Sequence, residues 1–104
     1  MILARVRGNV VSTTKSDRLA GLKLLLVVPI DIATFAEKGQ PLVAIDAVGA
    51  GEGEVVMCVS GSSSRQTALT DAKPVDLSII AIVDSVELKG DKIFEKFKNE
   101  RRPE

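Results

Sequence analysis

Short aliphatic runs separated by turn-forming residues are the feature that most limits how this chain can fold. Apolar and polar side chains alternate over residues 2–11, and continuous runs rich in Val, Ile, Leu and Ala cover 22–28, 42–48, 54–60 and 77–83. Runs of this length favour β-strands over helices. Aromatic residues make up only 3% of the chain and hydrophobic residues 45%, so the core must be aliphatic, as in strands buried on both faces.

These runs predict a mainly all-β fold, a small five-stranded barrel, because a closed barrel leaves no exposed edge on such apolar strands. Gly8 predicts a break or bulge in the first strand. One short helix is expected between the fourth and fifth strands, where Ser62 or Ser63 could cap a helix ending near Leu69. So much aliphatic strand in a short chain also suggests burial against other subunits.

The remaining segments predict loops and one hairpin. Residues 31–41 form a loop that could include a helical turn at Thr34–Glu37. A C-terminal hairpin is expected around Gly90-Asp91. We therefore expect one domain over residues 1–97 and a charged, flexible tail over residues 98–104.

Charge and composition argue against several classes of function. The chain has 14 basic and 14 acidic residues, so it has no net charge with which to attract nucleic acid or an anionic membrane. No apolar run approaches the roughly 20 residues that span a bilayer. Histidine is absent and Cys58 is the only cysteine, so the commonest general base and a structural zinc site are both missing. We expect no enzyme activity, no cofactor and no metal site, and a reducing, cytoplasmic setting.

Two small-residue segments flank the fourth strand. The first is Gly49, Ala50, Gly51, Glu52, Gly53 and Glu54. It lies between two strands, and its carboxylates would repel phosphate, so a phosphate-binding loop is rejected in favour of a turn or a close approach between chains. The second is Gly61, Ser62, Ser63, Ser64 and Arg65. Without a histidine, helix capping is favoured there over a nucleophilic serine.

Three carboxylates lie within or beside apolar strands: Asp46, Asp76 and Asp84. A carboxylate in such a place must be paired or must accept backbone N–H groups. The favoured interpretation is that these residues fasten turns and loops. Cys58, in the middle of a strand, is expected to be an inert buried thiol.

Taken in order, these motifs resemble the vertex proteins of bacterial microcompartments, of the ethanolamine-utilisation and carboxysome type. The resemblance covers nearly the whole chain. It rests on Gly8-x-Val10-Val11-Ser12-Thr13 with Lys15, Leu19-x-Gly21-x-Lys23-Leu24-Leu25, Ala44-x-Asp46-x-Val48-Gly49-Ala50-Gly51-x-Gly53-Glu54-x-Val56, Gly61-Ser62-Ser63-Ser64-Arg65, and Pro74-Val75-Asp76 through Ile82-Val83-Asp84. Ser64 departs from the alanine that is usual in the family.

The resemblance implies a barrel like the oligonucleotide/oligosaccharide-binding (OB) fold, and a homopentamer that caps the five-fold corners of a polyhedral shell. It further implies hexameric shell proteins and encapsulated enzymes as partners, in the bacterial cytoplasm. Residues 49–54 and 61–65 are then candidates for positions near the axis, with Lys15 as a further interface candidate. We expect a basic residue to neutralise Glu54, with Arg65 as first choice and Lys15 as second. The alternative is an OB-like module that binds single-stranded nucleic acid or another small ligand.

Overall fold

A computed structural model describes residues 1–12, 21–60 and 77–96 of the chain. Seven strands run through these residues, in the order β1 Ile2–Val10, β2 Lys23–Pro29, β3 Leu42–Asp46, β4 Val55–Ser60, β5 Leu77–Ile82, β6 Ser85–Leu88 and β7 Asp91–Glu95. The described residues contain no helix, and so none that could span a membrane. The short helix expected near residues 62–69 lies outside them.

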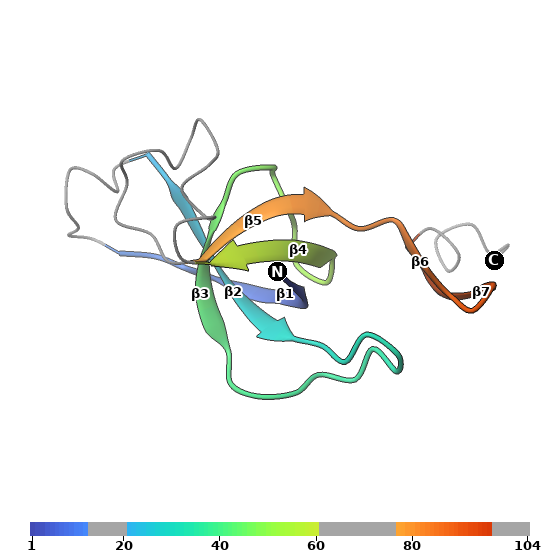
Figure 1. Cartoon of the computed structure of the whole chain (residues 1–104). Coiled ribbons are helices and arrows are strands. Elements are labelled where there is room, and N and C mark those ends of the chain that lie inside the picture. Colours follow the sequence, from blue (N-terminus) through green and yellow to red (C-terminus); the bar gives the residue numbers. More distant parts are fainter. Residues whose placement is uncertain (13–20, 61–76, 97–104) are drawn as a thin grey trace, which may run out of the picture.

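The first five strands form the closed barrel that the sequence predicts (Figure 1). Their order around the barrel is β1-β2-β3-β5-β4, and β1 pairs with β4 to close it. All neighbouring pairs are antiparallel except β3 and β5, which are parallel. The register of β1 against β2 shifts between Val6 and Gly8, so the bulge predicted at Gly8 is present.

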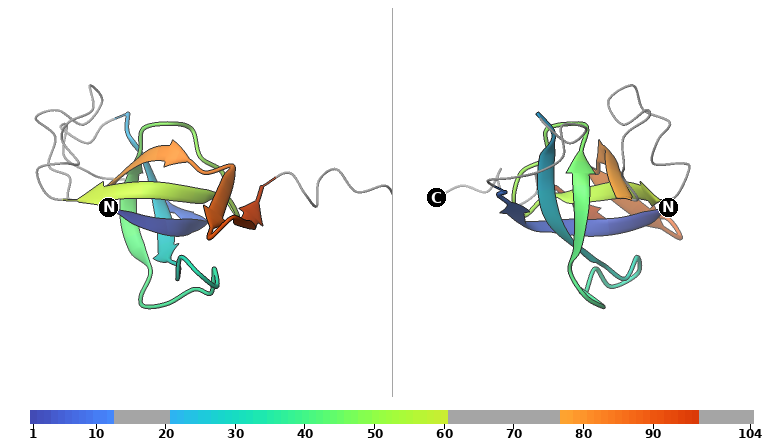
Figure 2. Two further views of the ribbon diagram at one scale, coloured as in Figure 1. Left: turned by 45° about the vertical axis from the view of Figure 1, so that its right-hand side comes forward. Right: turned by 90° about the vertical axis from the view of Figure 1, so that its left-hand side faces the viewer.

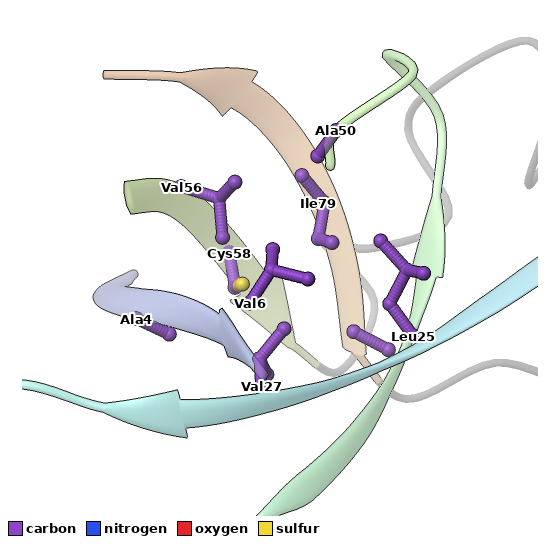
Figure 3. Packing of buried hydrophobic residues seen from close by; sticks show 9 residues of the cluster. Ala4, Val6, Leu25, Val27, Ala50, Val56, Cys58 and Ile79 are labelled. Carbon is purple, nitrogen blue, oxygen red and sulfur yellow. The ribbon is translucent and has the colours of Figure 1, made fainter. Parts of the chain in front are cut away.

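Alternating side chains of the barrel strands meet in one aliphatic core, shown in Figure 3. Small and branched residues fill it, as the scarcity of aromatic residues predicts: Ala4, Val6, Leu25, Val27, Ala44, Ala50, Val56, Cys58 and Ile79. Among the residues that the structure describes, Ala50 is the only member of this core that comes from a loop rather than a strand. The loop between β3 and β4 is therefore anchored in the core of the barrel.

The last two strands form a separate hairpin that lies beside one end of the barrel (Figures 1 and 2). Its turn is at Lys89 and Gly90, both with positive φ, one residue earlier than predicted. Phe94 and Val86 of the hairpin pack on a second cluster, built on Ile30 and Val55. The ring of Phe94 stacks on that of Phe35, with centroids 5.0 Å apart and an interplanar angle of 8°.

The helical turn proposed at Thr34–Glu37 is wrong. A single turn forms three residues earlier instead: the N–H of Phe35 donates to the carbonyl oxygen of Asp31, at 2.7 Å, and the carboxylate of Asp31 accepts the N–H groups of Ala33 and Thr34, at 2.9 and 3.1 Å. The two bonds to the carboxylate are the main reason that the pKa of Asp31 is lowered. Phe35 then takes a left-handed conformation, with φ of 61°, which ends the turn.

Candidate functional site

The glycine-rich loop, residues 47–54 between β3 and β4, contains the first of the two small-residue segments. Asp46, the last residue of β3, lies at its start and is only 6% exposed. Its Oδ1 accepts the N–H groups of Val48 and Gly49, at 3.0 and 2.9 Å. Its Oδ2 accepts the N–H of Ala50, at 2.9 Å. One buried carboxylate thus binds three consecutive amides and sets the path of the first half of the loop.

A lysine of the neighbouring strand lies beside this carboxylate. Lys23 of β2 is paired with Asp46 in the strand register. Its Nζ is 3.9 Å from Oδ2 of Asp46 and donates to the carbonyl oxygen of Ala50, at 3.3 Å. The lysine side chain is more than half exposed, so the positive charge remains in water while it partly balances the buried negative charge.

Glu54 organises the second half of the loop in the same way. Its Oε1 accepts the N–H of Gly51, at 2.6 Å, and its Oε2 forms an ion pair with Lys96, which directly follows β7. These two contacts, the one with Lys96 being the larger, lower the pKa of Glu54 below its ordinary value. Glu54 is therefore ionised at neutral pH, and its negative charge is balanced by the positive charge of Lys96.

The backbone of the loop returns to β1 at its end. Gly53 donates its N–H to the carbonyl of Val6, at 2.8 Å, and Val6 donates to the carbonyl of Glu54, at 2.9 Å. Gly53 has a φ of 88°, which a residue with a Cβ rarely adopts. Arg5 of β1 donates from Nη1 to the carbonyl of Gly53, at 2.9 Å. The loop is thus bound at its start, middle and end.

The predicted site residues differ in burial, and some of them lie outside the part of the chain that the structure describes. Gly49, Gly51, Glu52 and Gly53 are exposed on the loop surface, and Ala50 points into the core. Asp84 is exposed, and its carbonyl oxygen, rather than its carboxylate, accepts the N–H of Lys96, at 2.7 Å. Predicted residues outside the described part of the chain are Lys15, Gly61, Ser62, Ser63, Ser64, Arg65 and Asp76.

Sequence reasoning missed the basic residues that act on the loop: Arg5, Lys23 and Lys96. The expected partners of Glu54, Arg65 and Lys15, lie outside the described residues, and the partner that the structure gives is Lys96. Nothing in the local sequence distinguishes Lys96 from the other charged residues of the C-terminal segment. Only the fold, which brings residue 96 beside residue 54, reveals the pair.

A hollow of about 500 Å³ lies between the glycine-rich loop and β7. Its charged lining consists of Arg5, Glu52, Glu54, Glu95 and Lys96. Within the described ranges no three His, Cys, Asp or Glu side chains come together as metal ligands would. The hollow therefore combines paired charges of both signs and offers no arrangement typical of catalysis.

Cys58 has no reactive character. Its side chain is fully buried in the barrel core, and this burial raises its pKa to about 11. A thiol with such a pKa is almost entirely protonated at neutral pH, and the protonated form is a poor nucleophile.

Large apolar side chains are exposed at the start of β3. Leu42 is 39% exposed and Val43 is 52% exposed, although both belong to a barrel strand. Val48 in the glycine-rich loop and Val11 after β1 are also exposed. A contiguous patch of exposed aliphatic side chains is typical of a contact surface, whereas single ones are common on any protein surface.

Comparison with known proteins gives one consistent result. Residues 1–84 match the family described as ethanolamine utilisation protein EutN/carboxysome. The microcompartment shell vertex protein EutN of Salmonella typhimurium is 49% identical over 96 residues, which cover 92% of this chain and 96% of that protein. The carboxysome shell vertex protein CcmL of Gloeobacter violaceus is 42% identical over 100 residues, covering 92% and 95%.

Solved structures agree with the sequence matches. The structure of Gloeobacter violaceus CcmL superposes with a TM-score of 0.87 at 41% identity, over 92% of this chain and 98% of that one. The GrpN pentameric microcompartment shell protein of Rhodospirillum rubrum gives a TM-score of 0.76 at 41% identity, over 85% and 99%. The barrel, the glycine-rich loop and these similarities together show that the chain belongs to the EutN/carboxysome family of structural shell vertex proteins.

Proposed function

We propose that this chain assembles into a homopentamer that caps the five-fold corners of a polyhedral microcompartment shell. The observation that carries the proposal is the similarity, over nearly the full length of both chains, to a shell protein described as pentameric. The exposed aliphatic residues of β3, Leu42 and Val43, support it because a ring of subunits would remove such residues from water.

A cyclic pentamer uses a head-to-tail interface, in which two different surfaces of one subunit contact its two neighbours. We place residues 49–54 and 61–65 near the five-fold axis. The three exposed glycines of the loop allow close approach between copies because they carry no side chain. Pairing of Glu54 with Lys96 within one chain reduces the repulsion between five such loops.

The proposed partners are hexameric shell proteins around each corner, together with encapsulated enzymes, in the bacterial cytoplasm. A binding module for single-stranded nucleic acid is not favoured. The relatives are named as shell vertex proteins, the chain has no net charge, and it has no Trp or Tyr on which bases could stack.

The test is the mass of the purified full-length chain, measured by native mass spectrometry and by sedimentation across a dilution series. A species of five chains, each of 11.1 kDa, is expected. A monomer at micromolar concentration would refute the pentamer. Val43→Glu should weaken the assembly if β3 contributes to the interface. Ile32→Glu, a matched change of an exposed aliphatic residue in the loop before β3, serves as its control.

A further inference from the structure

The family model ends at residue 84, just before the C-terminal hairpin, whereas relatives such as EutN align over 92% of this chain and therefore extend into the hairpin. The hairpin packs on the barrel through Phe94, which lies against the cluster that contains Val55 of β4 and also stacks on Phe35 of the loop between β2 and β3. At the base of the hairpin, the N–H of Lys96 donates to the carbonyl oxygen of Asp84, at 2.7 Å. Lys96 is thereby fixed at the point where the hairpin returns to the end of the barrel strands.

From this position the side chain of Lys96 reaches the glycine-rich loop. Its Nζ forms an ion pair with Oε2 of Glu54, and both side chains are only about one-fifth exposed, at 19% and 22%. The other carboxylate oxygen of Glu54 accepts the N–H of Gly51. A single carboxylate therefore connects the hairpin with the middle of the loop.

The charges around this contact explain why a lysine is needed. Three carboxylates line the hollow between the loop and β7, those of Glu52, Glu54 and Glu95. Arg5 and Lys96 are the two cations of the lining, and Arg5 donates to the carbonyl of Gly53 rather than to a carboxylate. Lys96 thus directly offsets the charge of Glu54, which would otherwise be repelled by its acidic neighbours.

We propose that Lys96 is a positioning residue for assembly: it fixes Glu54, and through Glu54 the Gly51 segment of the loop, in the conformation that meets a neighbouring copy. The part of the inference that concerns assembly rests on the proposed function. The positioning itself is a property of one chain and can be tested in any oligomeric state.

The experiment compares the full-length chain with Lys96→Met, which keeps the length of the side chain and removes its charge. Lys92→Met is the matched control, because it removes a lysine of the same hairpin whose ion pair, with Glu95 at 3.5 Å, stays within β7. Lys96→Arg is the conservative variant. Amide hydrogen exchange is followed at Gly51 in the loop and at Val27 in the core, and the dissociation of the assembly is followed by dilution.

Lys96→Met should speed exchange at Gly51 about three- to tenfold, as expected for the loss of support to a charge-assisted hydrogen bond. Exchange at Val27 should not change, and the assembly should dissociate at a higher concentration. Lys92→Met should match the unmodified chain, and Lys96→Arg should restore most of the protection. The chemical shift of the Gly51 amide should change with pH as Glu54 ionises. The midpoint of that change should lie at a higher pH in Lys96→Met than in the other variants.

Unchanged exchange at Gly51 in Lys96→Met would overturn the proposal, whatever the mass of the assembly. Equal acceleration at Gly51 and Val27 would also overturn it, because that result indicates general destabilisation. Faster exchange at Gly51 with unaltered dissociation would overturn the role in assembly. A monomeric unmodified chain would refute the pentamer and, with it, the role in assembly, and exchange at Gly51 would still decide whether Lys96 positions the loop.

Discussion

Asp46 should be the residue whose loss most affects the glycine-rich loop. Its side chain is 1% exposed and accepts three N–H groups, those of Val48, Gly49 and Ala50. In Asp46→Ala, the N–H of Ala50 would remain buried without a partner. The amides of Val48 and Gly49 belong to exposed residues and can bond to water instead.

The loss of stability in Asp46→Ala can be worked out from this difference between one buried amide and two exposed ones. A buried amide without a partner costs about 1–3 kcal/mol, and the two bonds that are exchanged for bonds to water add roughly 0.5 kcal/mol each, the lower end of the net value for a hydrogen bond. Asp46→Ala should therefore lower the free energy of unfolding by about 2–4 kcal/mol. Asp46→Asn should keep most of this cost. Its amide keeps one acceptor oxygen for Val48 and Gly49 and turns an NH2 group toward the N–H of Ala50.

Urea unfolding at a fixed chain concentration measures these differences, since any assembly makes stability depend on concentration. Asp84→Ala is the control, because it removes an exposed carboxylate, and its effect should stay within about 0.5 kcal/mol. The reasoning is refuted if Asp46→Ala lies within about 0.5 kcal/mol of the unmodified chain. It is also refuted if Asp46→Asn is as stable as the unmodified chain.

Two further predictions concern titratable groups. Because the pKa of Glu54 is lowered in the folded state, its contribution to stability is present above its ordinary pKa of 4.5 and is lost as the pH falls through the lowered value. The difference in melting temperature between the unmodified chain and Glu54→Gln should accordingly shrink from pH 7 to pH 3; a constant difference would contradict this. Cys58, with its pKa raised to about 11 by burial, should not react with a thiol reagent at pH 8 until urea unfolds the chain. Rapid labelling of the folded protein would show that the barrel opens at Cys58.

The barrel could be predicted from the sequence because strand formation depends on local patterns. Alternation over residues 2–11 and the short aliphatic runs correspond closely to β1 through β5, and Gly8 marked the bulge correctly. These features follow from the two-residue period of a strand, which is visible in a single segment. The order of the strands around the barrel depends on which segments pair, and no local pattern states that directly.

The loop at residues 31–41 shows where local reasoning fails. Its composition permitted a helical turn, and a single turn does form, but at Asp31–Phe35, three residues before the predicted position, where the carboxylate of Asp31 caps it. Phe35 then turns into the left-handed region, and its ring stacks on Phe94, about 60 residues away in the chain. A contact with the C-terminal hairpin is thus part of what fixes this conformation, and it cannot be inferred from residues 31–41 alone.

The glycine-rich loop could be recognised in the sequence, but the reason for its carboxylates could not. A loop of glycines has almost no side chains that could satisfy its own amides, so most of its acceptors come from its ends and from β1. Asp46 accepts the amides of residues 48–50, and Glu54 accepts that of Gly51. A lysine lies beside each carboxylate, Lys23 and Lys96 respectively. Lys23 belongs to β2 and Lys96 follows β7. The contacts that hold the loop in place can therefore form only when these strands have folded beside it.

This arrangement changes the electrostatic problem that an assembly would face. The sequence places Glu52 and Glu54 in every loop, so five copies near one axis would bring ten carboxylates together. With Glu54 paired to Lys96 within its own chain, the exposed Glu52 is the one carboxylate of the loop for which the described residues show no cationic partner. Repulsion between exposed charges falls steeply beyond the Debye length of about 8 Å at physiological ionic strength. The proposed ring therefore requires only that the Glu52 side chains diverge into solvent, which the exposed glycines on either side of Glu52 permit.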